Sequence, residues 1–198
     1  MLRNLGVALL LLGFCERMWA EVLRYTIAKQ EYLFSKAFNM HSEKGPIGLL
    51  TETKLSLRTH YDLYNAKGIY EARGICRILS LGSLYAWAKE LDIYDAVGNK
   101  IGMVDGQAFS TAKAKYSLYD AMDYLLGIAY LDKDSSGFSI MHPLDDKVVL
   151  AFLKRNFVEN ALDDWEVALY DDKAIDPRIL KIFSAFTLDF QGDFKEDT

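Results

Sequence analysis

The segment Asp132–Gly137 has the spacing that opens a calcium-binding loop. Its first, third and fifth residues carry oxygen ligands and its sixth is glycine, which is the order in which an EF-hand loop surrounds Ca²⁺. A working loop also needs a bidentate glutamate at its twelfth position, and Pro143 stands there instead. We therefore interpret this segment as a hairpin turn and predict no metal site in it.

The other residue types with catalytic or ligating chemistry form no motif. The histidines His41, His60 and His142 do not pair at metal-ligand spacing, and zinc needs three or four converging ligands. The chain also lacks a Gly-x-Ser-x-Gly turn, a phosphate-binding loop and a dinucleotide-binding fingerprint. We therefore predict no catalytic residue, no metal ligand and no cofactor. Carboxylates that only the fold brings together would escape this argument, so an enzyme of unrecognised type stays as an alternative.

The charge balance argues against nucleic acid as a partner. The chain has 23 Lys and Arg against 28 Asp and Glu, a net charge of −5, whereas nucleic-acid binding needs a basic surface. A lipid headgroup or an acidic partner could still use a local basic cluster, although isolated charges are ordinary on a solvated surface. Three pairs of basic residues lie close in the sequence: Arg73 with Arg77, Lys113 with Lys115, and Lys154 with Arg155.

Residues 1–20 have the layout of a secretory signal peptide. Arg3 gives a short positive region, Leu5 to Phe14 is an unbroken apolar run, and Ala20 offers a small residue before a cleavage point. The run is about half of the roughly 20 residues that a membrane-spanning helix needs. We predict cleavage near residue 20 and export of a single domain, residues 21–198, to the periplasm, the cell envelope or the extracellular space. The alternative interpretation is a buried N-terminal helix or strand.

Cysteine usage indicates how the exported domain is stabilised. Cys15 lies in the segment that we expect to be removed, and the bulky Phe14 before it disfavours a lipid-attachment site. The remaining Cys76 cannot form an internal disulfide, so packing must stabilise the domain. Cleavage also removes two arginines and one glutamate, which takes the net charge from −5 to −6.

A strand–turn–strand unit recurs along the domain. Each copy alternates apolar and polar residues, passes through a turn rich in Asn, Asp and Gly, and continues into a second apolar stretch. Alternation with period two is typical of a half-buried strand, and these turn residues suit tight turns through backbone freedom and side-chain hydrogen bonds. Five copies begin at Phe38, Tyr61, Leu91, Tyr116 and Phe138, and a sixth start at Trp165 has no second strand.

The repeats predict twelve antiparallel strands. Five hairpins supply ten of them, and the segments Leu23–Lys29 and Trp165–Tyr170 supply two more. Strands this short and numerous must form a sandwich or close into a barrel to remove their edges. The Tyr-Asx-Ala triplets beginning at Tyr64, Tyr94 and Tyr119 are interpreted as turn residues, because an active site needs one set of groups and a scaffold needs many.

A helix should follow the last strand. Asp176 is a good N-cap, Pro177 suits the first helical position, and no helix breaker occurs from Arg178 to Phe190. The segment is apolar on nearly every face, so we expect it to be buried on nearly every side. Threading through a barrel meets that requirement better than lying on its surface.

The order of these elements resembles the LURP-one-related proteins of the tubby C-terminal-like superfamily. The resemblance covers roughly residues 22–192 and rests on units such as Leu91–Gly98, on the run Val149–Phe157, on Trp165–Val167 and on the apolar helix Ile179–Phe190. It implies a mainly β fold: a closed antiparallel barrel of about twelve strands with the hydrophobic C-terminal helix through its centre. Tubby domains bind phosphoinositides and the related phospholipid scramblases act at membranes, but the phosphoinositide-binding residues have no matching motif in this chain.

These observations favour a non-catalytic exported barrel that binds a partner protein or a membrane lipid through its outer surface or loops. One alternative is an unrecognised envelope or extracellular hydrolase, which requires a polar cleft with a perturbed carboxylate or histidine. A second alternative is a lipocalin-like small-molecule carrier, which requires an open lumen with the helix packed outside.

Overall fold

The structure is a computed structural model that describes residues 23–53, 58–77, 89–106, 114–132, 136–156 and 164–190. The segment predicted to be a signal peptide lies outside these residues. The described residues form twelve strands and one helix: β1 (Leu23–Glu31), β2 (Ser35–Ser42), β3 (Gly45–Thr53), β4 (His60–Asn65), β5 (Tyr70–Cys76), β6 (Leu91–Asp95), β7 (Lys100–Gly106), β8 (Ala114–Asp120), β9 (Leu125–Leu131), β10 (Gly137–His142), β11 (Asp145–Asn156), β12 (Asp164–Leu169) and α1 (Pro177–Asp189).

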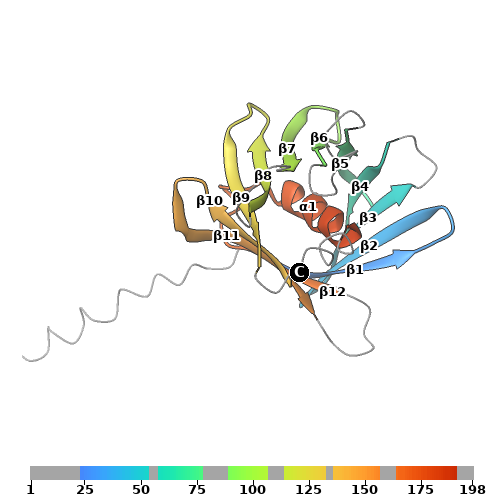
Figure 1. Ribbon diagram of the computed structural model, residues 1–198. Helices are drawn as coiled ribbons and strands as arrows, with labels where there is room; N and C mark the ends of the chain where they lie inside the picture. Colours follow the sequence, from blue (N-terminus) through green and yellow to red (C-terminus); the bar gives the residue numbers. More distant parts are fainter. Residues whose placement is uncertain are drawn as a thin grey trace, which may run out of the picture.

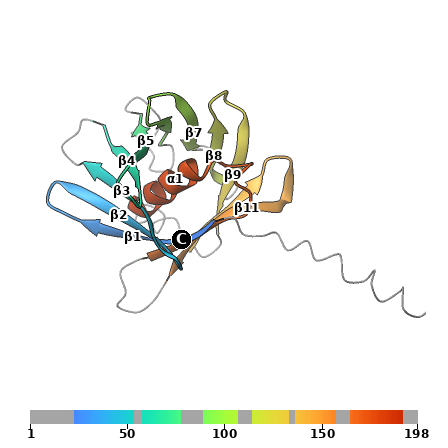
Figure 2. The ribbon, with the colours of Figure 1, turned by 180° about the vertical axis from the view of Figure 1, so that it is seen from behind.

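The twelve strands close into one barrel. Each strand pairs antiparallel with the next strand of the chain. The ring closes where β1 pairs with β12, with Leu23 opposite Leu169 and Ala28 opposite Asp164. Figure 1 and, from behind, Figure 2 show the strands arranged around α1. The prediction of a closed antiparallel barrel with about twelve strands is confirmed.

The alternating strand directions place the connections at two ends of the barrel. The turns β2–β3, β4–β5, β6–β7, β8–β9 and β10–β11 lie at one end, which we call the hairpin end, and α1 starts there after β12. The β1–β2 turn lies at the opposite end. The last turn of α1 reaches that opposite end, because Asp189 contacts Lys36 at the start of β2.

Side-chain chemistry shapes three turns of the hairpin end in the same way. Oδ1 of Asp95 accepts hydrogen bonds from the amides of Val97 and Asn99 at 3.0 and 2.8 Å. Asn65 and Asp120 accept the equivalent two amides in their own turns. The third residue after each of these has a positive φ: Gly68, Gly98 and Asp123. The Tyr-Asx-Ala triplets therefore belong to turns, as predicted.

Helix α1 runs inside the barrel. The carboxylate of Asp176 accepts a hydrogen bond from the amide of Arg178 at 2.8 Å, and Pro177 occupies the first helical turn. The buried residues cover every face of the helix: Ile179, Leu180, Ile182, Phe183, Ser184, Ala185, Phe186, Thr187 and Leu188. The prediction of a hydrophobic central helix is confirmed. The lumen that a lipocalin-like carrier requires to be open therefore holds this helix.

Two glycines in the wall let the helix approach. A Cβ at Gly74 would lie 2.6 Å from Cγ2 of Ile182, and a Cβ at Gly102 would lie 2.5 Å from Cδ1 of Ile179. Carbon atoms pack at about 3.5–4.0 Å, so a larger residue at either position would force the facing isoleucine or the wall to shift.

Candidate ligand-binding groove

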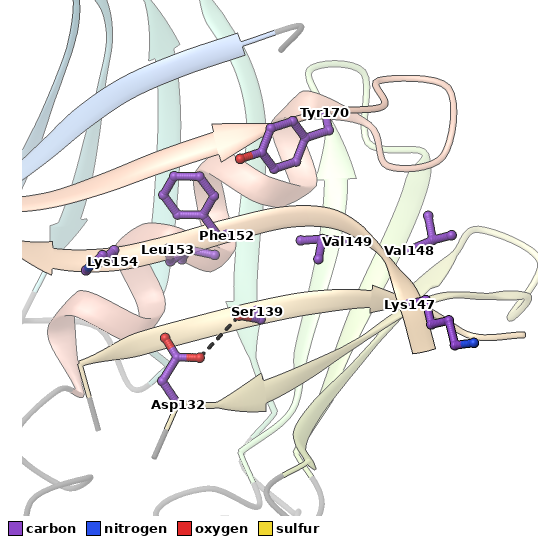
Figure 3. Close-up of a pocket in the computed structure, with 9 residues that line it drawn as sticks. All are labelled: Asp132, Ser139, Lys147, Val148, Val149, Phe152, Leu153, Lys154 and Tyr170. Atoms are coloured by element: carbon purple, nitrogen blue, oxygen red, sulfur yellow. Dashed lines mark hydrogen bonds between the residues drawn. The ribbon is translucent and has the colours of Figure 1, made fainter. Parts of the chain in front are cut away.

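A groove of about 740 Å³ lies on the outer face of the barrel, along β11. This volume falls within the roughly 300–1,000 Å³ of small-molecule sites. Figure 3 shows the residues that line it, which come from β10, from β11 and from the positions directly after β9 and β12. They are Asp132, Ser139, Lys147, Val148, Val149, Phe152, Leu153, Lys154 and Tyr170, and we call this feature the outer groove.

A β-bulge in β11 exposes apolar side chains along the outer groove. Ile140 pairs with Ala151 and Met141 pairs with Val149, so Leu150 has no partner on β10. Both Leu150 and Ala151 are buried, and the alternation of inward and outward residues shifts at this point. Val149 is consequently 38% exposed, on the outer face. Farther along, the ring of Phe152 packs 5.9 Å from that of Tyr170, which extends the apolar floor.

Two lysines mark the ends of the outer groove. Lys147 and Lys154 are exposed and lie at opposite ends of the line of apolar residues (Figure 3). Neither ammonium group forms an ion pair or a hydrogen bond with the residues that the structure describes. Seven residue steps along a strand span about 23 Å, and the bulge shortens this somewhat. The outer groove therefore offers a long apolar floor with a cation at each end.

The polar cluster at the opposite end of the barrel has a different character. Nζ of Lys36 donates to both carboxylate oxygens of Asp189, at 2.7 and 2.9 Å, and the hydroxyl of Tyr61 donates to the same carboxylate at 3.0 Å. Oε2 of Glu52 lies 3.3 Å from the same ammonium group, without the alignment of a hydrogen bond. Burial alone would lower the pKa of Lys36, but Asp189 and Glu52 outweigh it and raise that pKa. The cluster binds the end of α1 to the wall, so we assign it a structural role.

A polar cleft of about 610 Å³ at the hairpin end bears on the hydrolase alternative. Glu71, Asp120, Asp172 and Asp176 line it beside the start of α1. Burial disfavours the charged form of Asp176, but hydrogen bonds from Arg178 outweigh that effect and lower its pKa. A general acid needs a raised pKa. The pKa of Asp105 is raised by burial and by Glu90, but this residue does not line the cleft.

The described candidate ligands from the sequence do not form a metal site. Residues 133–135 of the calcium-like segment lie outside the described residues, while the amide of Asp132 donates to the carbonyl of Gly137 at 3.0 Å. The histidines lie on three different strands: His41 on β2, His60 on β4 and His142 on β10. Within the described part of the chain, no group of three His, Cys, Asp or Glu side chains could hold a metal ion.

The three basic pairs also have different environments. Arg73 pairs with Asp62, and Arg77 pairs with Glu90 and Asp92, so both arginines are neutralised by neighbours. Lys113 and the side chain of Lys115 lie outside what the structure describes. Lys154 points outward into the outer groove whereas Arg155 is buried, because neighbouring residues of a strand face opposite ways. Of the described side chains of these pairs, Lys154 alone lines the outer groove.

Sequence reasoning did not find the outer groove. The sequence did carry one signal for it: the run Val148–Leu153 is apolar at every position, whereas an antiparallel strand with one solvated face should alternate apolar and polar residues.

Comparisons with protein families and with curated proteins find no match to this chain. Among the described residues, no helix has both the length and the apolar character needed to cross a membrane.

Proposed function

We propose that the protein is a non-catalytic exported barrel that binds a membrane lipid, specifically an anionic lipid with a long apolar chain, in the outer groove. The observation that carries the proposal is the apolar floor of Val149, Phe152 and Tyr170 between two lysines whose ammonium groups pair with none of the described residues. An alkyl chain would cover the floor, and Lys147 or Lys154 would pair with the headgroup. Because α1 fills the lumen, the outer face is where a ligand of this size finds room.

A fluorescent fatty acid, cis-parinarate, is a suitable probe of the outer groove. We expect Phe152→Asp and Val149→Asp each to weaken binding by about tenfold, because each places a charge against the alkyl chain. Lys147→Gln or Lys154→Gln should weaken it about two- to fivefold, the size of an exposed ion pair. Lys67→Gln, which removes an exposed lysine of the β4–β5 turn, is the matched control. Equal affinity for the probe in all variants would show that the fatty acid binds outside the outer groove. Binding of a partner protein without binding of lipid would favour a protein as the ligand.

We further infer that the chain is a LURP-one-related member of the tubby C-terminal-like superfamily. The twelve-stranded barrel around a hydrophobic C-terminal helix supports this proposal, since it is the arrangement that the resemblance implies. The test is superposition on tubby-like domains. The same strand order with the helix running in the same direction is expected, and a helix of opposite direction would count against membership.

Export is likewise a proposal, supported by Arg3 and the apolar run of residues 5–14. N-terminal sequencing of protein purified from its native cells should begin near Glu21. An intact Met1 in a cytosolic fraction would contradict it.

The non-catalytic character can be tested with a broad hydrolase screen. No turnover is expected, since the carboxylates of the hairpin-end cleft include Asp176, whose pKa is lowered rather than raised. Reproducible activity that a single Asp, Glu or His substitution abolishes would favour the envelope-hydrolase alternative.

A further inference from the structure

Three neighbouring turns of the hairpin end each carry a strongly exposed apolar side chain. Val97 in the β6–β7 turn is 82% exposed, Met122 in the β8–β9 turn is 77% exposed, and Leu144 in the β10–β11 turn is 90% exposed. Their hairpins follow one another around the barrel, side by side in Figure 1. We call these three the tip residues. Single exposed apolar residues are ordinary, but one at the tip of each of three adjacent hairpins is a pattern.

The turns themselves do not require apolar residues at these positions. In the first two turns the carboxylates of Asp95 and Asp120 accept backbone amides and fix the conformation. Val97 and Met122 contribute only their amides to those bonds, and any residue except proline could supply an amide. Their side chains make no contribution to the barrel core and stay exposed.

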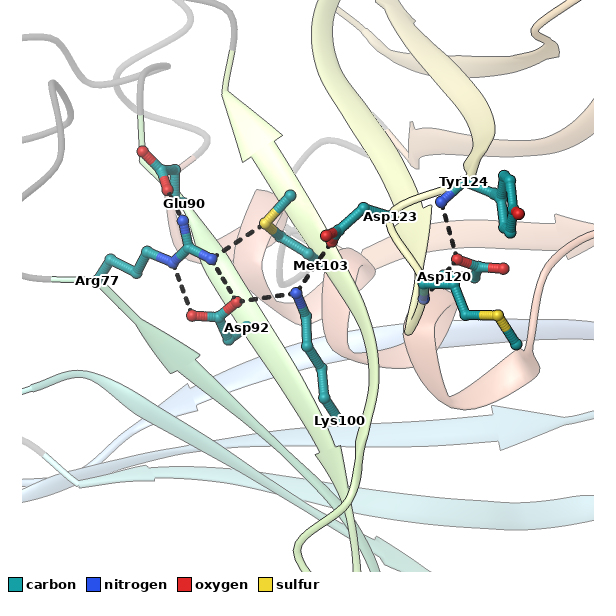
Figure 4. A network of polar contacts seen from close by, with 9 residues as sticks. Arg77, Glu90, Asp92, Lys100, Met103, Asp120, Asp123 and Tyr124 are labelled. Atoms are coloured by element: carbon teal, nitrogen blue, oxygen red, sulfur yellow. Dashed lines mark hydrogen bonds and ion pairs between the residues drawn. The ribbon is translucent and has the colours of Figure 1, made fainter.

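An ion-pair network holds two of the tips in place. Lys100, which follows the β6–β7 turn, lies 3.2 Å from Oδ1 of Asp123 in the β8–β9 turn and 3.8 Å from Oδ1 of Asp92 (Figure 4). Nε of Arg77 donates to the same Asp92 at 2.7 Å. The network joins strands β6 and β7 to the next hairpin. The two turns that carry Val97 and Met122 are therefore linked by this ion pair.

The charges around the tip residues indicate what kind of surface they meet. Carboxylates outnumber cations in and beside these turns: Asp95, Asp120, Asp123, Asp145 and Asp146 against Lys100 and Lys147. An anionic membrane would be repelled by this end of the barrel. A zwitterionic lipid presents an ammonium group outermost, which complements the carboxylates, and its acyl region accepts separate apolar side chains. A protein interface instead needs one contiguous apolar core, which three separated tips do not provide.

We propose that the hairpin end docks on a zwitterionic lipid surface by inserting the tip residues. This inference concerns a different surface from the outer groove and does not depend on a lipid binding there. The two surfaces are nevertheless adjacent, since Lys147 and Val148 of the outer groove lie in the first residues of β11, which starts after the turn that carries Leu144. A barrel docked in this way holds one end of the outer groove beside the membrane.

Tryptophan scanning with brominated phosphatidylcholine vesicles tests the inference. The readout must be local, because the apolar run of residues 5–14 could itself hold the full-length chain on a vesicle. Val97→Trp, Met122→Trp and Leu144→Trp are compared with Leu33→Trp, a matched control that is 80% exposed in the β1–β2 turn at the opposite end. Native tryptophan fluorescence is subtracted, and circular dichroism checks each fold.

We expect loss of fluorescence at the three tip positions and none at position 33. Replacing part of the lipid with an anionic phospholipid should weaken the loss, and Phe152→Asp should leave it unchanged. Quenching at position 33 alone, quenching at no position, or quenching only with anionic lipid would each overturn the proposal. If the tip positions are quenched but the outer groove binds no fatty acid, the proposed function is wrong and the docking proposal stands.

Discussion

The hydroxyl of Tyr25 in β1 donates a hydrogen bond to Oγ of Ser184 in α1, across 3.0 Å. The direction follows from the serine, whose own proton goes to the carbonyl oxygen of Lys181 at 2.8 Å. Both residues are buried, so the bond joins the barrel wall to the helix inside the core. The two partners are therefore not equivalent: the serine has a second bond, and the tyrosine hydroxyl donates only to the serine.

This asymmetry predicts that Ser184→Ala is more destabilising than Tyr25→Phe. Ser184→Ala leaves a buried tyrosine hydroxyl without an acceptor, which costs about 1–3 kcal/mol, whereas Tyr25→Phe removes a bond worth about 1 kcal/mol and leaves the serine bonded to Lys181. Urea unfolding measures both changes in the free energy of unfolding. The opposite order would mean that the serine is the donor in this pair.

The central helix should supply a large share of the core energy. Phe183→Ala or Phe186→Ala should each cost about 3–5 kcal/mol, because both rings are fully buried. A domain has only about 5–15 kcal/mol of stability, so the double variant should be unfolded or nearly so. The matched control is Phe34→Ala, whose ring is exposed in the β1–β2 turn. A loss below about 1 kcal/mol at both helix positions would contradict tight packing.

Removal of the helix should abolish the barrel. A chain that ends at Pro177 keeps all twelve strands but loses the residues that fill the space between their inward faces. We expect the truncated chain to be unfolded or aggregated. Circular dichroism measures its β-sheet content, and size-exclusion chromatography measures its oligomeric state. A monomeric truncated chain with an unchanged circular dichroism spectrum would show that the strands close into a barrel without helix α1 inside.

The elements that the sequence predicted are those that local chemistry determines. The turns at Asp95 and Asp120 could be predicted because each side chain bonds to amides of its own turn. The start of α1 could be predicted for the same reason, since Asp176 caps it from the adjoining position. In each case the residues that cooperate are at most four apart, and a single sequence displays them together.

Features made by distant segments could not be predicted in this way. The outer groove depends on the unpaired Leu150, and only the register between β10 and β11 determines that a bulge occurs there. The cluster of Lys36 and Asp189 joins residues 153 positions apart. In the sequence, Leu150, Lys36 and Asp189 look like ordinary strand and helix residues. Their roles depend on the register between neighbouring strands and on how far the helix extends into the barrel, which the sequence alone does not display.

High pH should destabilise the protein. Burial raises the pKa of Tyr25, and burial together with Asp189 raises that of Tyr61, while ion pairing raises that of Lys36. A raised pKa means that the folded state keeps its proton when the unfolded chain has lost it, so stability is full below about pH 10 and falls as pH rises above it. Urea midpoints measured between about pH 8 and pH 11 should decline, and Tyr25→Phe should make the decline shallower. A flat profile would contradict this linkage.

The thiol of Cys76 should be unreactive in the folded protein. Burial raises its pKa to about 12, so almost no thiolate is present near neutral pH, and the thiolate is the reactive form. Iodoacetamide should alkylate Cys76 slowly in buffer and readily in urea, as peptide mapping of the labelled chain measures. Peptide mapping also separates this site from Cys15. Rapid labelling at Cys76 without denaturant would show that the opposite end of the barrel opens.

Closure of the barrel by β1 and β12 has a consequence for how the chain is made. Strand β1 can pair with β12 only after residues 164–169 have been synthesised, and α1, which fills the lumen, follows later in the chain. These contacts need the end of the chain, whereas the other strand pairings join consecutive strands and close short loops. The nascent chain therefore lacks a complete hydrophobic core until its last helix has emerged.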